Sequence, residues 1–330
     1  MRVLVVTSMY PTPAHPGLGR FVRDQVDALR ALEGLEVELF TIEPGPRTRF
    51  VRAARELRRA YRGERFDVVH AHHGLTGWSA LAVRGAPRIV TFHGTDLSHP
   101  IVGPLSRALA RLVDLPAPVS SSLARIPGAG LPGAGDRRAA PVLPCGVNLD
   151  RFAPRDRRDA RRALGLDPDG RYLLFPADPA RPEKRHDRAA ELARAAGNVE
   201  LLTYAGIASD RVPDTINAAN AVIATSQREG FGLGPLEALA CNVPVLSTDV
   251  GIAPVALRGV EGALCAPFDR AGWMRALAPH LEHPDPRVAG RPRAALFDRS
   301  RMAARVFEVY RELAAENGYT SRPGAAESAV

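Results

Sequence analysis

Glu229 and Glu237 stand eight positions apart in the segment E-G-F-G-L-G-P-L-E, which combines two carboxylates with three glycines. Glycine has no Cβ, so Gly230 and Gly232 would let the backbone approach a ligand closely. Pro235 favours the start of a helix directly after them, and the free N–H groups of a first helical turn attract negative charge. The segment therefore predicts a loop that binds a ligand.

The residues around this loop predict where it lies in a sheet. Residues 221–225 and 243–248 are short apolar runs typical of buried parallel strands, and 235–241 is expected to be a helix between them. Open α/β sheets bind ligands at the carboxyl ends of their strands, where this loop would stand. The alternative is an ordinary glycine-rich turn, since such turns are common in α/β folds and two glutamates can fall at this spacing by chance.

Two further groups of polar residues follow predicted strands. Lys184 is the single lysine among 44 Lys and Arg residues, and it lies in a basic loop, 176–186, after the predicted strand 172–175. His93 follows the predicted strand 88–92, while His70, His72 and His73 lie at the end of another, 67–71. Because parallel strands end at one edge of a sheet, these residues predict a polar cleft. No carboxylate or cysteine completes a zinc ligand set around the histidines, so no metal is expected.

Short strands and helices alternate along both halves of the chain, which predicts an α/β protein with two doubly wound domains facing a central cleft. The expected domains are 1–148 and 149–316, and the last helix, about 301–315, is expected to pack back toward the first domain. A Pro/Gly loop is expected over 127–135, and a disordered tail over 317–330.

Composition narrows the class of protein. The chain of 330 residues has ordinary apolar and charged contents, 45% and 24%, and a net charge of +8 that favours phosphate-bearing partners. It contains no apolar run long enough to span a bilayer, and its three cysteines are widely spaced, so a cytoplasmic protein with reduced thiols is expected.

Residues 47–62 predict a helix with an apolar stripe and many arginines. This pattern fits a helix lying on an anionic membrane surface, which would make the protein peripheral to the membrane. It also fits a solvated helix whose apolar stripe packs on the sheet in an arginine-rich proteome, and both interpretations stay open. The arginines of this segment are Arg47, Arg49, Arg52, Arg55, Arg58, Arg59 and Arg62.

Four landmarks then occur in a fixed order over nearly the whole chain. They are a glycine loop after the first strand (Gly17, Gly19), the motif P-x-G-V-x4-F beginning at Pro144, the basic loop with Lys184, and E-x7-E. With this order and spacing the chain resembles the retaining glycosyltransferases of family 4, which have the GT-B architecture of two Rossmann-like domains. The segment E-A-L-A-C-N-V-P-V-L-S-T-D-V-G is similar in sequence to bacterial cell-wall and exopolysaccharide enzymes of the teichuronic-acid type.

The resemblance implies a transfer of a hexose-type sugar from a nucleotide sugar, a UDP- or GDP-sugar, without a cofactor or metal. Acceptors in such families are polysaccharide precursors, lipid-linked sugars or small molecules. By the same resemblance Lys184 and Arg181, with Arg185 adjacent, neutralise the diphosphate. The family spacing is R-x4-K, whereas Arg181 lies only three positions before Lys184, so this arginine departs from the pattern.

The resemblance also implies roles for the other candidate site residues. Glu229 would contact the donor sugar, Glu237 the ribose hydroxyls, and His93 the sugar from across the cleft. The other donor-binding residues implied are Gly17, Gly19, Gly206, Gly230, Phe231, Gly232 and Leu233.

Two other functions are compatible with parts of these observations. A sugar-nucleotide epimerase shares the GT-B fold and would act on the donor without an acceptor. A basic nucleic-acid-binding module would explain the net charge, but the arginines are dispersed and no helix-turn-helix, RNA-binding or OB pattern occurs, so no nucleic-acid partner is expected.

Overall fold

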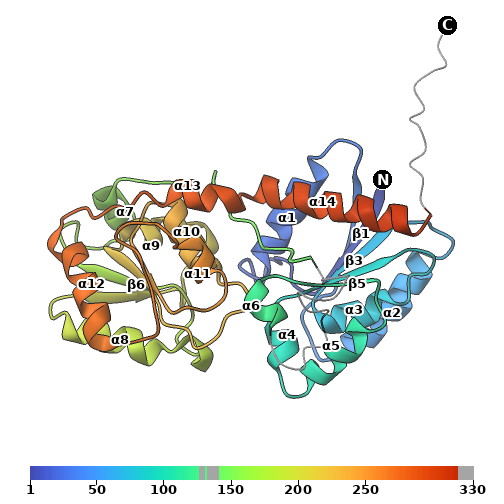
Figure 1. Ribbon diagram of the computed structural model, residues 1–330, viewed down its shortest axis with the longest axis horizontal. Helices are drawn as coiled ribbons and strands as arrows, with labels where there is room; N and C mark the ends of the chain where they lie inside the picture. The colour runs from blue at the N-terminus through green and yellow to red at the C-terminus, as the bar shows by residue number, and fades with distance from the viewer. Residues whose placement is uncertain (126–130, 132–140, 319–330) are drawn as a thin grey trace, which may run out of the picture.

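A computed structural model describes residues 1–125, 131 and 141–318, and it contains two parallel β-sheets, each with helices on its faces (Figure 1). The first sheet has the strand order β2-β1-β3-β4-β5 and the second β10-β9-β8-β6-β7. Every strand pair is parallel, so each sheet presents the carboxyl ends of its strands at one edge. The described part of the chain is thus a two-domain α/β protein, as expected.

The first domain alternates strands and helices from its first residues. Its elements are β1 (Arg2–Thr7), α1 (Arg20–Arg30), β2 (Glu36–Thr41), α2 (Arg49–Ala60), β3 (Val68–His72), α3 (Gly74–Ala80), β4 (Arg88–Phe92), α4 (Thr95–Ser98), α5 (Val102–Ala110), β5 (Leu115–Pro118) and α6 (Ser121–Ala124).

The second domain repeats this alternation and ends in a long helix. Its elements are α7 (Arg157–Ala163), β6 (Tyr172–Phe175), η1 (Pro182–Lys184), α8 (His186–Ala195), β7 (Glu200–Thr203), η2 (Ser209–Arg211), α9 (Val212–Ala218), β8 (Ala221–Ala224), α10 (Leu233–Ala240), β9 (Val245–Ser247), α11 (Ala253–Ala256), β10 (Leu264–Cys265), α12 (Arg270–Glu282), α13 (Arg291–Ala294), η3 (Ala295–Phe297) and α14 (Arg299–Glu316).

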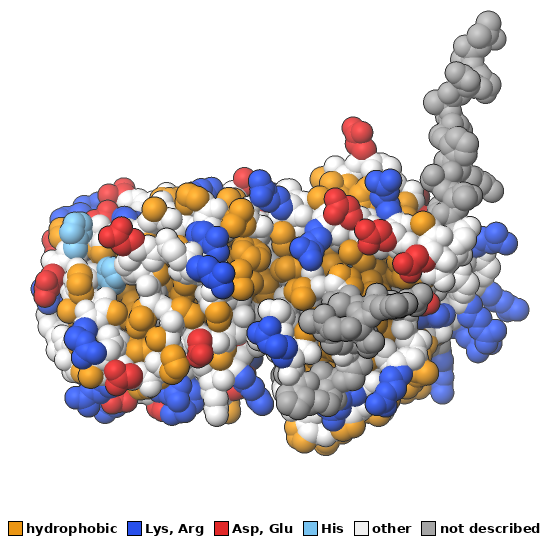
Figure 2. All heavy atoms as spheres, in the orientation of Figure 1, with side chains coloured by type: hydrophobic (Ala, Val, Ile, Leu, Met, Phe, Trp, Pro, Cys, Tyr) orange, Lys and Arg blue, Asp and Glu red, His pale blue; other side chains and the backbone are white. Residues whose placement is uncertain are grey.

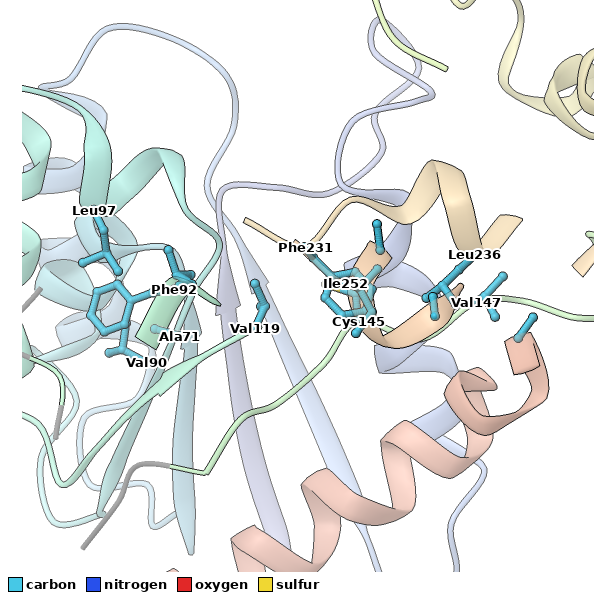
Figure 3. Close-up of a cluster of buried hydrophobic side chains, with 14 of the residues drawn as sticks. Ala71, Val90, Phe92, Leu97, Val119, Cys145, Val147, Phe231, Leu236 and Ile252 are labelled. Atoms are coloured by element: carbon cyan, nitrogen blue, oxygen red, sulfur yellow. The ribbon is translucent and has the colours of Figure 1, made fainter. Parts of the chain in front are cut away.

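The strands are apolar because helices cover both faces of each sheet. In β1, residues Val3 to Val6 are fully buried, and in β8 so are Ala221, Val222 and Ile223. One cluster of buried side chains continues from the first domain into the second. Figure 3 shows its two parts, with Phe92 and Leu97 in the first domain and Phe231, Ile252 and Cys145 packed together at the junction. The domains therefore meet through packed apolar side chains.

The chain crosses between the domains twice, and the two crossings are hydrogen-bonded to each other. The Val147 N–H donates to the Phe297 carbonyl at 2.8 Å, and the Arg299 N–H donates to the Val147 carbonyl at 2.9 Å. A Cβ on Gly146 would lie 2.6 Å from the Arg299 Cα, so only glycine fits this close approach. From here α14 runs back over the first domain, where it packs against α1 and buries Val306 and Tyr310 (Figure 1).

The expected elements differ from the structure mainly at short helices. The strand β5 ends at Pro118, and the Ser120 side chain then caps the short helix α6 by accepting from the Leu123 N–H. The loop expected at 127–135 lies almost entirely outside the described residues, as do all but the first two residues of the expected tail. Within the described chain, no helix is both long and apolar enough to cross a membrane.

Candidate functional site

A cavity of about 340 Å³ lies between the domains, at the edge where strands of both sheets end. The first domain contributes the loop after β1, the start of α1 and the segment after β4. The second domain contributes the basic loop after β6 and the glycine loop after β8. Its lining residues are Met9, Phe21, His93, Gly94, Thr95, Ser98, Leu123, Cys145, Arg181, Glu183, Lys184, Arg228, Glu229, Gly230, Phe231, Gly232 and Leu233.

Lys184 and Glu229 form the central ion pair of this cavity. The Lys184 Nζ donates to both carboxylate oxygens of Glu229, at 2.6 and 2.7 Å, and the Ser226 hydroxyl donates to Oε1 at 2.7 Å. The two side chains are only 13% and 17% exposed, so their geometry is held by packing as well as charge. Since an ammonium carries three N–H donors, Lys184 retains one for a further anion.

The backbone around Lys184 is tied to the neighbouring strand. The Thr225 hydroxyl donates to the carbonyls of Lys184 and Arg185 at 3.2 and 2.8 Å, and the Gln227 N–H donates to the Glu183 carbonyl at 2.8 Å. The basic loop and the glycine loop thus form one hydrogen-bonded unit. The spacing between the lysine and the carboxylate is fixed by the sheet.

The glycine loop leads directly into a helix whose first turn faces the cavity. Gly232 has φ 83°, a left-handed conformation, and caps α10, and Gly230 to Leu233 all line the cavity. The N-terminus of a helix carries partial positive charge and free N–H groups. Anion-binding groups therefore face the cavity from both the helix and Lys184.

The arginines of the basic loop point in different directions. Arg181 lines the cavity and donates through Nη2 and Nε to Glu183, at 2.6 and 2.9 Å. Arg185 is instead bound to Asp187, at 2.7 and 2.8 Å, and does not line the cavity. Arg228, which sequence analysis missed, does line it. Its signal was available, because Arg228 directly precedes Glu229 at the carboxyl end of a strand.

Of the four histidines expected to form a polar cleft, only His93 lines the cavity. His70 and His72 are buried in β3, and the His73 side chain caps its own turn by accepting from the Leu75 N–H. The prediction of a four-histidine cleft was wrong for three of them, because His70 and His72 point into the core from β3 and His73, which follows β3, caps α3.

The buried histidines nevertheless reach the cavity as a chain. The Tyr310 hydroxyl of α14 lies 2.6 Å from His70 Nδ1, His70 stacks on His72 at 4.5 Å, and His72 Nδ1 lies 3.1 Å from His93 Nε2. Burial, reinforced by neighbouring histidines, lowers the pKa of His93 well below that of free imidazole, so its ring is neutral at neutral pH. The loop holding His93 is fixed by Asp96, whose carboxylate accepts the N–H groups of His93 and Gly94.

The two domains touch at the glycine loop itself. A Cβ on Gly230 would lie 1.7 Å from the His93 carbonyl oxygen, and a Cβ on Gly94 would lie 2.7 Å from the Gly230 Cα. The Ser120 hydroxyl also donates to the Gly230 carbonyl, at 2.6 Å. His93 and the glycine loop are thus held in contact across the domain boundary.

Glu237 lies in α10, one turn beyond Leu233, and does not line the cavity. Burial raises its pKa to about 7, and the positive charge of Arg151 opposes this rise. Arg151 donates to the Ser209 carbonyl, and Arg20 of α1 donates to the Ser209 hydroxyl. A second polar region with Glu237 and these two arginines therefore adjoins the segment after β7.

The remaining predicted residues lie outside the cavity. Gly17 is exposed with open space around it, and Gly206 is exposed with φ 70°. Gly19 has φ 58° and would place a Cβ 2.2 Å from the Met9 backbone, so its glycine permits the loop that carries Met9 into the cavity. Within the described residues, no group of three or more His, Cys, Asp or Glu side chains could hold a metal ion.

Solved structures of other proteins share this two-domain fold. Sucrose-phosphate synthase from Thermosynechococcus elongatus superposes with a TM-score of 0.73 at 20% identity, over 96% of this chain and 100% of that one. HepE from Anabaena, solved in complex with UDP and glucose, superposes with a TM-score of 0.64 at 15% identity, over 94% and 100%. The two facing Rossmann-like domains thus have the GT-B fold of glycosyltransferases.

Sequence comparison identifies the family. Residues 15–151 match the model of Glycosyltransferase Family 4, and residues 173–283 match Glycosyl transferases group 1. The D-inositol 3-phosphate glycosyltransferase of Actinosynnema mirum is 30% identical over 84% of this chain and 88% of its own length, and that of Thermobispora bispora is 31% identical over 82% and 76%. The chain belongs to glycosyltransferase family 4.

Proposed function

We propose that this glycosyltransferase moves a hexose-type sugar from a nucleoside diphosphate sugar to a hydroxyl acceptor, with retention of the anomeric configuration and without a metal ion. The observation that carries the proposal is the Lys184–Glu229 pair beside the α10 N-terminus, facing His93 across the cleft. A cation and a helix N-terminus suit a diphosphate, while a carboxylate and a neutral imidazole suit sugar hydroxyls.

The departing diphosphate needs compensation for the negative charge that develops on it. The third N–H of Lys184 and the N–H groups of Gly232 and Leu233 are the candidates for this role, and their fixed positions cost no reorganisation during the reaction. Arg181 and Arg228 line the same cavity and extend the positive charge toward solvent. Arg228, or Arg181 once it leaves Glu183, would take the place of the family arginine missing from the R-x4-K spacing.

Retention is proposed from the resemblance to the retaining enzymes of family 4, and a route without a covalent intermediate is proposed because the carboxylates among the described lining residues, Glu183 and Glu229, are both paired. Both oxygens of Glu229 are bound by Lys184, and Oε1 also accepts from Ser226. A carboxylate held in this way can orient a hydroxyl group or stabilise positive charge at the anomeric carbon. Attack of the acceptor on the face that the leaving group vacates, with the phosphate taking the proton, requires no further base.

The donor is proposed to be a UDP- or GDP-sugar, with its ribose at Glu237 and its base near Gly206. HepE, which shares the fold, was solved with UDP, so a UDP-sugar is the first donor to test. The acceptor is proposed to be a polysaccharide precursor, a lipid-linked sugar or a small molecule. The name of the curated relatives makes D-inositol 3-phosphate a first acceptor to try.

A thermal-shift screen with UDP-, GDP-, ADP- and TDP-sugars tests the donor, because a ligand bound only by the folded state raises the melting temperature. The donor selected is then incubated with acceptor, and the anomeric configuration of the product is read by NMR, with and without EDTA. Retention and insensitivity to EDTA are expected. An inverted product, or activity abolished by EDTA and restored by a divalent cation, would contradict the mechanism.

Incubation with the donor alone distinguishes the proposed transferase from a sugar-nucleotide epimerase. A sugar-nucleotide epimerase would convert the donor without acceptor, whereas a transferase is expected to leave it largely intact.

A further inference from the structure

Four of the exposed large apolar side chains lie on one face of the first domain, away from the cavity between the domains. They are Val51 on α2, which is 58% exposed, and Ile101, Leu105 and Leu112 on and beside α5, which are 58%, 46% and 57% exposed. Pro104 and Ala108 are also exposed and continue the α5 stripe at helical spacing. Among the described residues, only two other large apolar side chains, Val255 and Leu296, are similarly exposed.

A groove runs between this stripe and α2. Its volume is about 480 Å³, and the side chains of Phe50, Val51, Leu75, Trp78 and Leu105 give it an apolar lining. The Trp78 indole N–H donates to the Leu105 carbonyl at 3.1 Å, so the α3–α5 wall of the groove is held in place. An apolar groove of this size, beside an exposed apolar stripe, is unusual for a surface that faces only water.

Arginines border the groove on its α2 side. Arg47 lines it, and Arg55 and Arg58 lie one helical turn from Val51 and Ala54, on the same flank of α2. Arg52, Arg59 and Arg62 are exposed around the rest of the helix. The acidic residues nearby are Glu56 and Glu64, and Glu64 is already paired with Arg2 at 2.7 Å. Figure 2 shows basic side chains gathered at this end of the molecule and apolar ones along the lower edge of the same domain.

We propose that the α2–α5 face, defined as these arginines with the groove and the α5 stripe, docks on the surface of an anionic lipid bilayer. The arginines would bind lipid phosphates, while Leu105, Leu112 and Ile101 would enter the boundary between headgroups and acyl chains. The arginines would thus meet the phosphate layer of the membrane, and the apolar side chains would meet the layer below it.

The positive charge of the α2–α5 face argues against a second copy of this chain as its occupant. In a symmetric contact with a second copy of this chain, the same patch would face itself, so the α2 arginines of the two copies would approach one another. Like charges at an interface are unfavourable. An anionic bilayer instead complements both the charge and the apolar stripe. The inference concerns a surface remote from the cavity and does not depend on the proposed reaction.

Binding to vesicles tests the proposal. Co-sedimentation is measured with vesicles of phosphatidylcholine alone and of phosphatidylcholine mixed with phosphatidylglycerol. Binding is expected only to the anionic vesicles, and it should weaken as salt is raised. The variant R47Q/R55Q/R58Q/R62Q should bind about a thousandfold more weakly, since each arginine near the surface contributes about 1 kcal/mol. The matched control R194Q/R258Q/R275Q/R301Q, which removes four exposed arginines elsewhere, should bind like the wild type.

The apolar stripe has its own pair of variants. L105S/L112S is expected to lower binding at high salt, whereas V255S/L296S, which alters the two exposed apolar residues of the other domain, is not. Equal loss of binding in the two arginine variants, or no binding to anionic vesicles by the wild type, would overturn the proposal. So would a dimer seen by light scattering that L105S/L112S dissociates.

Tryptophan fluorescence of the unmutated protein provides a test that does not depend on the folding of any variant. The chain has two tryptophans, Trp78 at the groove and Trp273, which is 1% exposed in the core of the other domain. Lipids brominated on their acyl chains should quench part of the emission when the α2–α5 face docks. Full sedimentation with the vesicles without any quenching would place the contact elsewhere and overturn the proposal.

Discussion

Lys184 and Glu229 form a partly buried ion pair within the fold, and we also propose that they bind the donor. Removing either partner would leave the other partly buried and unpaired, which is costly, so their effects on folding and on transfer have to be separated. The geometry also explains why a lysine suits this position. An ammonium can bind a carboxylate with two of its N–H groups and an anion with the third, while a guanidinium fork of fixed planar shape would not direct its donors in this way.

Lys184→Met should lower kcat by about a hundredfold to a thousandfold, because in the proposed mechanism it removes a positioned donor to the leaving diphosphate. The rate of sugar transfer is measured beside that of Arg194→Met, an exposed position on α8, which should be unaffected. Lys184→Met/Glu229→Gln provides the second control. If the double variant recovered wild-type kcat, the loss would arise from the unpaired carboxylate and the diphosphate role would fail.

Glu237 carries a pKa near 7, so its titration lies in an accessible range. Its pKa in the folded state is above the value of 4.5 for an ordinary glutamate, so the folded state favours the protonated form. The contribution of Glu237 to the free energy of unfolding therefore decreases as pH rises from 4.5 through 7, and Glu237→Gln should remove this contribution. With allowance for partial solvation, the variant should gain about 2 kcal/mol over wild type between pH 4.5 and pH 8.

Urea denaturation at the two pH values checks this difference. Donor binding gives an independent readout of the proposed ribose contact, because an ionised carboxylate accepts hydrogen bonds from two hydroxyl groups more strongly than a protonated one. Wild-type donor affinity should increase as pH rises through 7, and that of the glutamine variant should not. A stability difference between the two proteins that is constant with pH would contradict the assigned titration.

At the scale of elements, the glycine loop and its two strands were predictable. The apolar runs at 221–225 and 243–248 contain β8 and β9, because strands buried on both faces leave a continuous apolar signal. The glycines and Pro235 marked the start of α10 to within two residues. The basic loop was equally visible, since a lone lysine after a strand stands out in an arginine-rich chain.

Contacts between distant segments were not predictable. Tyr310 meets His70 across 240 positions, and nothing local to β3 indicates that its histidines are hydrogen-bonded to the last helix. Arg181 and Arg185 illustrate the same limit, because acidic neighbours two positions away decide where each arginine points. Short helices such as α7 and α13 also escaped, since fewer than two turns of polar residues carry no periodic apolar signal.

Gly230→Ala should separate the glycine loop from the His93 loop, because the new Cβ would overlap the His93 carbonyl oxygen at 1.7 Å. Sugar transfer is expected to fall at least about a hundredfold, since small misplacements of reacting groups have large kinetic effects. Small-angle scattering should show a larger radius of gyration.

Ser120→Ala serves as the matched control for this contact. It removes one hydrogen bond to Gly230, a net loss of about 1 kcal/mol, without introducing overlap, and should reduce transfer only about fivefold. Wild-type transfer by Gly230→Ala would show that the contact between the two loops is not required in the reacting state.

At the scale of the whole molecule, buried histidines should limit stability in acid. Burial lowers the pKa of His70, His72 and His93 below 6.5, so the folded state stays neutral where the unfolded chain binds protons. Stability is therefore full above pH 6.5 and lost as pH falls below it, at about 1.4 kcal/mol per pH unit for each histidine. Between pH 7.5 and 5.5 the three together should cost about 4 kcal/mol.

Urea denaturation across this pH range measures the loss. His72→Gln should reduce it by about one third, because one of the three protons is no longer taken up on unfolding. His15→Gln, which changes an exposed histidine, is the matched control. An unchanged dependence in His72→Gln would mean that His72 is already protonated in the folded state.

The pairing of Val147 with the segment that leads into α14 has a mechanical consequence. Two separate connections between domains would define an axis, but here they are joined into a single pivot, with Gly146 seated against Arg299. Any rotation of one domain relative to the other would then be centred on this pairing, and groups far from it would move furthest. A residue inserted into either connection alone would shift it out of step with the other, so we expect insertions to be tolerated at loop tips far from the pivot and not within 145–149.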